Sequence, residues 1–373
     1  MNAHDSERIK GMLESIGLGE APSQADADVL VFNTCTIREK PDTRFAAHMG
    51  NAAKLKRERP GTVVAVGGCY AEAQRERLFE LYPDVDVAFG PGTISHLGDW
   101  LGAGGEGVAR GAFGTGEERA FAARLPVRRE RRFQAWVQVS MGCNSVCSYC
   151  IVPAVRGRET SRRPGEVLAE VERLTAEGVR EVTLLGQNVN SYGRDVGSSF
   201  AELLRAVDVV RGIERIRFTS PHPKDFRRDV IAAMAECAAV CEHAHLPLQS
   251  GSSRILKAMR RTYNRERYLD RVALIREHVP DVALAMATET RSPGAASPLK
   301  LTVVFLRVRP RRSSGSVRLE PSTSTSSTMP TRPAFRSAAT RCTTSTSRSM
   351  RSRFSSSGTC SGIAAASVPA RGE

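Results

Sequence analysis

Three cysteines within eight residues form the clearest chemical feature of this chain. Cys143, Cys147 and Cys150 stand four and three positions apart, in a stretch that also contains Gly, Asn and Ser residues. A [4Fe–4S] cluster is normally held by four cysteine thiolates. Three thiolates at this spacing leave one iron without a protein ligand and open to a small molecule. The spacing therefore favours an iron–sulfur centre that binds and activates a ligand.

Other roles for these cysteines fit less well. A structural zinc site takes four ligands, commonly as two close pairs, whereas no second pair follows here and the nearest downstream histidine is His222. Disulfides belong to oxidising compartments, and no signal-peptide pattern opens the chain. Inert buried cysteines remain an alternative. Because there is also no apolar run of about 18 residues, we expect a cytoplasmic protein without a membrane span.

The charge is unevenly distributed along the chain. A formal net charge of +14 suggests a nucleic-acid partner. The chain has 54 basic and 40 acidic residues, and 14 of the basic and 2 of the acidic ones lie between Arg291 and Glu373. Positions 1–290 therefore carry 40 basic and 38 acidic residues. Residues 288–373 are rich in Ser, Thr, Arg and Pro and lack periodicity, so we expect a disordered basic tail. It is either an RNA-binding arm or, as the abrupt break favours, the product of a reading-frame error.

The strand and helix patterns predict an α/β protein with two domains. Residues 1–101 form an expected open parallel-sheet domain, 102–130 a linker, and 131–287 a partial (β/α) barrel. Strands are predicted at 28–32, 62–66, 85–89, 135–140, 181–185, 215–219, 243–248 and 282–287. Helices are predicted at 6–16, 43–57, 71–81, 164–177, 200–210, 224–236, 252–259 and 265–277.

Cysteines follow the predicted strands in both domains. Cys35 and Cys69 come just after the first two strands, and Cys143 follows the first strand of the barrel. Open sheets and barrels of this kind place their sites at the carboxyl ends of the strands. Cys35 and Cys69 are therefore expected to converge, although each alone would be a candidate for core packing. Cys237 and Cys241 have helical spacing and are expected to pack in the core.

Several stretches resemble the radical S-adenosylmethionine (radical-SAM) methylthiotransferases over roughly residues 1–287. The resemblance is carried by Met1–Glu7, Asn33–Glu39, Gly67–Tyr70, Gly142–Pro153, Arg156–Glu159, Leu185–Tyr192, Ser220–Pro223 and His245–Gly251. It implies two [4Fe–4S] clusters and S-adenosylmethionine as cofactors. One cluster would sit on Cys143, Cys147 and Cys150, and the other on three N-terminal cysteines that include Cys35 and Cys69.

The resemblance also implies a reaction. A 5′-deoxyadenosyl radical would remove hydrogen from C2 of N6-dimethylallyladenosine at position 37 of tRNA, in the anticodon loop, and a methylthio group would take its place. An electron donor such as flavodoxin or ferredoxin would be the protein partner. Arg38-Glu39 and Arg156–Glu159 look more like the tRNA-modifying members than their ribosomal-protein relatives. Modification of a ribosomal protein stays open as an alternative.

Two departures from the family pattern stand out. The family has a cysteine just ahead of the segment that here begins at Met1-Asn2, which suggests a start placed too late. The family would also continue beyond Ala287 into a Gly-Phe-Pro-Gly-Glu turn, the rest of the barrel and a small RNA-binding domain. An inactive, frameshifted iron–sulfur protein is therefore a further alternative.

Five polar residues are candidates for binding cofactor or substrate. Gln187 and Asn188 follow a predicted strand, so they should face the barrel mouth, with loop capping as the alternative. His222 lies between two prolines, His245 lies on a predicted strand, and Gln249 follows it. For these three, a hydrogen-bonded structural role is the alternative.

Overall fold

The structure is a computed structural model that describes residues 1–35, 40–102, 111–114, 121, 125–285 and 302–308. These residues belong to one compact unit, Met1–Arg312. None of the helices in these ranges combines the length and the apolar character that crossing a membrane requires.

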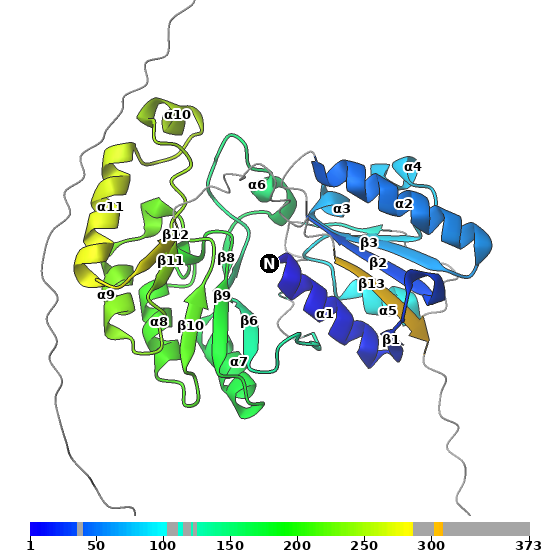
Figure 1. The fold of residues 1–373 in the computed structure, drawn as a ribbon, viewed down its shortest axis with the longest axis horizontal. Coiled ribbons are helices and arrows are strands. Elements are labelled where there is room, and N and C mark those ends of the chain that lie inside the picture. Colours follow the sequence, from blue (N-terminus) through cyan, green and yellow to red (C-terminus); the bar gives the residue numbers. More distant parts are fainter. Residues whose placement is uncertain (36–39, 103–110, 115–120, 122–124, 286–301, 309–373) are drawn as a thin grey trace, which may run out of the picture. The chain divides into compact units, whose positions relative to one another are not determined.

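A six-stranded sheet organises the first third of the chain (Figure 1). Its order is β1-β13-β2-β3-β4-β5, with β2 to β5 parallel and β13 antiparallel to both of its neighbours. The bounds are Leu18–Glu20 (β1), Val29–Thr34 (β2), Val63–Gly68 (β3), Val87–Phe89 (β4), Gly111–Ala112 (β5) and Thr302–Val308 (β13).

Helices cover both faces of this sheet, and the alternation in β2 shows why. Leu30 and Phe32 point to one face, where they pack with residues of α2, α3 and α4. Val29 and Val31 point to the other face and pack with α1 and α5. Successive strand residues face opposite sides, so a strand with no polar alternation must be covered twice. The bounds are Asn2–Ser15 (α1), Lys40–Glu58 (α2), Cys69–Gln74 (α3), Arg77–Leu81 (α4) and His96–Gly102 (α5).

Residues 134–285 alternate strands and helices as a partial (β/α) barrel. β6, β9 and β10 form a parallel sheet, β11 pairs in parallel with β12, and one bridge from Ile216 to Val240 links the two. α7, α8, α9 and α11 pack on these strands in one core. The strands are Gln134–Gln138 (β6), Ser140–Met141 (β7), Thr160–Ser161 (β8), Glu181–Leu185 (β9), Arg215–Phe218 (β10), His243–His245 (β11) and Ala283–Ala285 (β12). The helices are Val152–Arg156 (α6), Pro164–Ala176 (α7), Phe200–Asp208 (α8), Arg228–Glu236 (α9), Ser253–Ala258 (α10) and Arg265–His278 (α11), with 3-10 turns at Gln24–Asp26 (η1), Val189–Ser191 (η3) and Pro223–Asp225 (η4).

Some predicted elements differ from those observed. The helix predicted over 71–81 is split into α3 and α4, because the chain turns at Arg75, whose φ is +49°. The strand predicted over 135–140 ends at Gln138, and the next residues form β7, which pairs antiparallel with β8. The predicted linker contributes β5 to the edge of the sheet. Cys237 is buried as predicted, whereas Cys241 is partly exposed.

The predicted tail contains a strand. We expected no regular structure after Ala287, and β13 contradicts this for Thr302–Val308. Its sequence, Thr-Val-Val-Phe-Leu-Arg-Val, is rich in β-branched and aromatic residues that favour strands. The rest of the predicted tail, with Cys342 and Cys360, lies outside the described residues. The predicted domain boundaries stay predictions.

Candidate functional site

The three clustered cysteines lie in a loop between β7 and α6. The chain enters the loop at Gly142, whose φ is +81°. A Cβ at this position would lie 2.1 Å from the carbonyl oxygen of Arg158, so only glycine fits. Cys143 N donates to the carbonyl oxygen of Gly157 at 3.1 Å. The first cysteine is therefore held against the segment that follows α6.

The thiols of this loop lie near one another at the surface. All three are free, with Cys143 and Cys147 partly exposed and Cys150 exposed. Partial desolvation of its sulfur raises the pKa of Cys150; a backbone hydrogen bond from Val152 opposes this, and negative charge on Cys147 and Cys143 adds to it. Among the described residues, no three Cys, His, Asp or Glu side chains already meet as a metal site. The thiols are thus close enough to repel as thiolates, and a shared cation would stabilise them.

Arg261 is the charged neighbour of the cysteine loop. Its Nη1 donates to Cys147 Sγ at 3.1 Å and lies 3.4 Å from the hydroxyl of Tyr149. It reaches the loop because Ser148 Oγ donates at 3.2 Å to the carbonyl oxygen of Ala258, which ends α10. A guanidinium beside a sulfur favours the thiolate, the form that ligates metal. No local motif marks Arg261, since its partner lies 114 positions earlier.

Unpaired polar atoms gather where β9 ends. Both side-chain polar atoms of Gln187 and the Oδ1 of Asn188 are buried and have no hydrogen-bond partner within the described structure. Ser145 Oγ, in the cysteine loop, is in the same state. Leaving such an atom unpaired costs about 1–3 kcal/mol. Their presence favours a polar ligand at this place, and Ser145 was not predicted because serine is common in any loop.

A cavity of about 60 Å³ lies beside the loop and contains some of these groups. Burial raises the pKa of Glu159, although the Ser191 hydroxyl, which donates to its carboxylate at 2.5 Å, opposes this. The lining is polar throughout, so the cavity suits a hydrogen-bonding ligand. It consists of Asn144, Ser145, Glu159, Asn188, Arg194, Asp195 and Lys224.

Cys35 and Cys69 follow neighbouring strands of the first sheet. The β2–β3 register pairs Thr34 with Gly68, so the next residues, Cys35 and Cys69, leave the sheet at the same edge. Gly68 has a φ of +94°, and a Cβ there would lie 2.2 Å from the carbonyl oxygen of Thr34. The two strand ends therefore approach as closely as glycine allows. The convergence of their positions that we predicted is present; their role as ligands stays a prediction.

Arg156 connects Cys69 to the barrel. It is the last residue of α6, is buried, and its Nη2 lies 2.9 Å from Asp5 Oδ2 in α1. Burial would lower the pKa of Arg156, but Asp5 and a hydrogen bond to the Cys69 thiol raise it above its ordinary value. Likewise burial would raise the pKa of Asp5, but Arg156 and His4 hold it below its usual range. The helix α6, which follows Cys150, thus packs against α3, which begins at Cys69.

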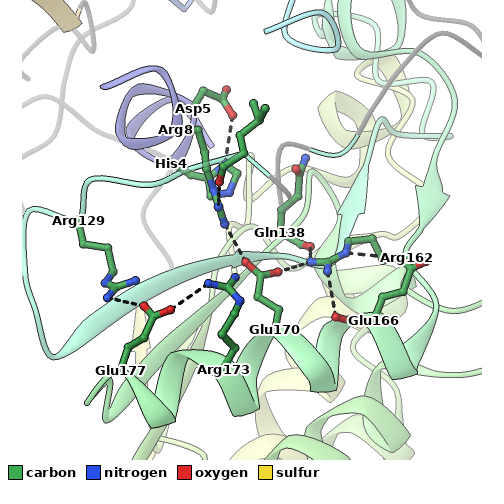
Figure 2. Close-up of polar contacts among 11 residues, drawn as sticks. His4, Asp5, Arg8, Arg129, Gln138, Arg162, Glu166, Glu170, Arg173 and Glu177 are labelled. Carbon is green, nitrogen blue, oxygen red and sulfur yellow. Dashed lines mark hydrogen bonds and ion pairs between the residues drawn. The ribbon is translucent and has the colours of Figure 1, made fainter. Parts of the chain in front are cut away.

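A second buried contact attaches α1 to the barrel (Figure 2). Arg8 Nη2 lies 2.7 Å from Glu170 Oε1 in α7, and Arg162 Nη1 lies 2.5 Å from the other oxygen of the same carboxylate. All three side chains are at most 5% exposed. The ion pair of Arg8 with Glu170 and that of Asp5 with Arg156 therefore fix α1, and with it the first sheet, against the barrel.

Comparisons with known proteins match both parts of the chain. Residues 137–293 match the family model of the Radical SAM superfamily, and residues 1–90 match that of the Uncharacterized protein family UPF0004. A tRNA-2-methylthio-N(6)-dimethylallyladenosine synthase of Streptomyces viridosporus is 50% identical over 299 residues, which is 79% of this chain and 59% of its own. One from Saccharopolyspora erythraea is 48% identical over 79% of this chain and 60% of its own. The chain is therefore similar to the Radical SAM superfamily over residues 137–293 and to these tRNA-modifying synthases over about four fifths of its own length.

The chain spans about three fifths of the length of these curated relatives. Solved structures with some similarity include the radical S-adenosylmethionine methyltransferase TsrM from Kitasatospora setae, at 18% identity and a TM-score of 0.47 over 64% of this chain and 51% of that one. The cobalamin-dependent S-adenosylmethionine radical enzyme OxsB shows 15% identity and a TM-score of 0.48 over 75% of this chain and 42% of that one.

The other predicted cofactor residues lie in different settings. His222 is buried; burial, with the cations Arg261 and Lys224, lowers its pKa to about 3. Its neutral ring accepts a hydrogen bond at Nδ1 from the backbone N of Lys224 at 3.1 Å. His245 is partly exposed on β11, and Gln249 follows in a loop with a φ of +69°. The 60 Å³ cavity is not lined by His222, His245 or Gln249. Their cofactor roles stay predictions.

Proposed function

We propose that this chain carries the catalytic region of a tRNA methylthiotransferase. The reaction would place a methylthio group at C2 of N6-dimethylallyladenosine at position 37. The observation that best supports this is the packing of α3, which begins at Cys69, against α6, which ends at Arg156. Because Arg156 ends the helix that follows Cys150, both cysteine sets belong to one region. A reaction that activates a C–H bond and also delivers sulfur needs two such sets side by side.

The residues present fit this proposal in their chemistry, with three cysteines for the first cluster and two for the second. Cys143, Cys147 and Cys150 would hold the cluster that binds S-adenosylmethionine, and Cys35 and Cys69 would contribute to the second. When bound, these groups supply the one-electron and sulfur chemistry that replaces a C–H bond by a C–S bond.

The protein's own groups prepare the site for such a ligand. Arg261 places a guanidinium against the sulfur of Cys147, while Gln187 and Asn188 offer buried donors and acceptors beside the loop. Burial, with the cations Arg261 and Lys224, lowers the pKa of His222 to about 3, so it adds no positive charge. The site thus favours a polar, zwitterionic ligand that brings its own charges.

Partners and location follow from the same proposal. We infer that tRNA binds through its anticodon loop and that a flavodoxin or ferredoxin supplies electrons in the cytoplasm. Residues 1–101 would then be the sulfur-delivering domain and 131–287 the radical-generating one, joined by the linker.

The test is anaerobic reconstitution of the whole chain with iron and sulfide. We expect Cys147→Ala to lose the iron of one cluster and to stop forming 5′-deoxyadenosine under reducing conditions. Cys241→Ala lies outside both cysteine sets and should keep its iron content and its 5′-deoxyadenosine formation. The reconstituted protein is then incubated with tRNA from a strain that lacks the enzyme. Mass spectrometry should find a methylthio mark on this tRNA after the incubation. A mark on a ribosomal protein and none on tRNA would contradict the proposal.

A further inference from the structure

A larger cavity, of about 460 Å³, lies between the start of α9 and the first half of α11. Four cations line it: Lys224 in η4, Arg228 at the start of α9, and Arg267 and Arg271 on α11. The lining contains one carboxylate, Asp270. Residues four apart on a helix lie on the same face, about 5–6 Å apart, so Arg267 and Arg271 form a row along the cavity. We call this cavity the α9–α11 groove.

The protein neutralises only part of the groove's positive charge, through Asp270 and Asp225. Arg228, Arg267 and Arg271 form no ion pair with any described residue, and Lys224 Nζ lies 3.8 Å from Asp225 Oδ2. Burial lowers the pKa of Arg271, and the nearby Arg228 lowers it further. Cations that repel one another in a concave surface are stabilised by an anion that several of them can share.

Two contacts link the groove to the cysteine loop. Lys224 lines both the groove and the 60 Å³ cavity that contains Asn144 and Ser145 of the loop. On the other side, Tyr263 forms part of the groove wall and its hydroxyl lies 3.3 Å from Nε of Arg261, whose Nη1 contacts Cys147. The groove therefore adjoins the cavity beside the cysteine loop.

The walls indicate which part of a nucleic acid would lie there. Tyr263 and Tyr268 are 6% and 1% exposed. Their hydroxyls are 3.1 Å and 2.7 Å from the carbonyl oxygens of Leu248 and Leu246. Rings that are this buried are not platforms for stacked bases. Guanidinium groups, by contrast, bind phosphate oxygens in pairs.

We propose that the α9–α11 groove binds the phosphodiester backbone of the RNA substrate next to the nucleotide that is modified. This inference rests on the proposed function, because it takes tRNA as the substrate. A concave groove lined by four cations fits a nucleic-acid backbone better than it fits an acidic protein, whose docking requires roughly 1,200 Å² or more of broad surface.

The experiment measures binding of unmodified tRNA to the reconstituted protein by fluorescence anisotropy at several salt concentrations. Arg228→Gln, Arg267→Gln and Arg271→Gln should each weaken binding several-fold and reduce the slope of log affinity against log salt by about 1. Arg276→Gln, on the same helix but outside the groove, should bind as the wild type does. Thermal unfolding of each variant separates loss of binding from loss of fold.

The outcomes separate this inference from the proposed function. If the wild type binds and modifies tRNA and folded groove variants bind equally well with an unchanged salt slope, the groove assignment is wrong while the function stands. If the wild type modifies a ribosomal protein and does not bind tRNA, the proposed function itself fails. If the groove variants lose binding of an acidic flavodoxin but keep tRNA, the groove serves the electron donor and the inference is overturned.

Discussion

A buried neutral histidine makes stability depend on pH. His222 is 8% exposed, and its backbone is tied to Asn190 by two hydrogen bonds of 2.8 and 3.1 Å. Its pKa falls from 6.5 to about 3 on folding. Between these values the unfolded chain binds a proton that the folded chain does not, so this contribution to stability is complete above pH 6.5 and is lost as the pH falls towards 3.

We therefore predict a smaller acid sensitivity for His222→Asn. An asparagine oxygen can accept the hydrogen bond from Lys224 N without titrating in this range. Between pH 6.5 and 3 the wild type should lose about 1.4 kcal/mol per pH unit through this residue, and His222→Asn should lack that slope. Urea unfolding at a series of pH values measures it, with the exposed His243→Asn as control. Parallel pH profiles for the wild type and His222→Asn would contradict the assignment.

At the scale of elements, the attachment of α1 to α7 depends on one carboxylate. Glu170 accepts from Arg8 and Arg162, and Arg8 also donates to the carbonyl oxygen of Leu125 at 2.6 Å. Glu170→Gln would leave two buried guanidinium groups without a counter-charge, which should reduce the free energy of unfolding by about 3–5 kcal/mol. Glu172→Gln, exposed on the same helix, should change it by less than about 0.5 kcal/mol.

A matched replacement separates charge from packing at this contact. Substituting Arg8, Glu170 and Arg162 together by Met or Leu removes the buried charges and keeps apolar volume, so it should cost far less than Glu170→Gln alone. Urea unfolding of both variants compares them. If Glu170→Gln unfolds like the wild type, the ion pairs do not hold α1 in place.

The elements also show what a sequence can and cannot reveal. Cys143, Cys147 and Cys150 are recognisable because their spacing lies within eight residues. The strand ends at Cys35 and Cys69 are recognisable because apolar strands are local patterns. Contacts such as those from Arg261 to Cys147 and from Arg156 to Asp5 span 114 and 151 positions. No local pattern encodes them, because they depend on how the strands and helices pack.

For the whole molecule, the placement of charge matters more than its total. Positions 1–290 carry 40 basic and 38 acidic residues, so net charge gives no reason to expect nucleic-acid binding by this part. Many of these charges are already used in ion pairs, as in the contact of Arg8 with Glu170. Four cations remain together in the α9–α11 groove. The local surplus, rather than the basic composition of residues 288–373, is the basis for expecting an RNA partner.

The late strand leads to a prediction about the whole chain. β13 lies between β1 and β2, with five residue pairs to β2 and three to β1. Leu30 and Phe32 of β2 are fully buried. A chain that stops at Ala287 would leave the β2 edge without a partner, and unpaired edges promote aggregation.

We expect the shortened chain 1–287 to unfold about 3 °C below the full chain, which corresponds to roughly 2 kcal/mol for a folded unit of this size, and to scatter more light on heating. A chain that ends at Arg312 keeps β13 and the whole of the compact unit Met1–Arg312, so it should unfold as the full chain does. Circular dichroism and light scattering measure both properties. Equal unfolding temperatures for the 1–287 and 1–312 chains would show that β13 adds nothing to the sheet, and the segment after Ala287 would then behave as its composition alone predicts.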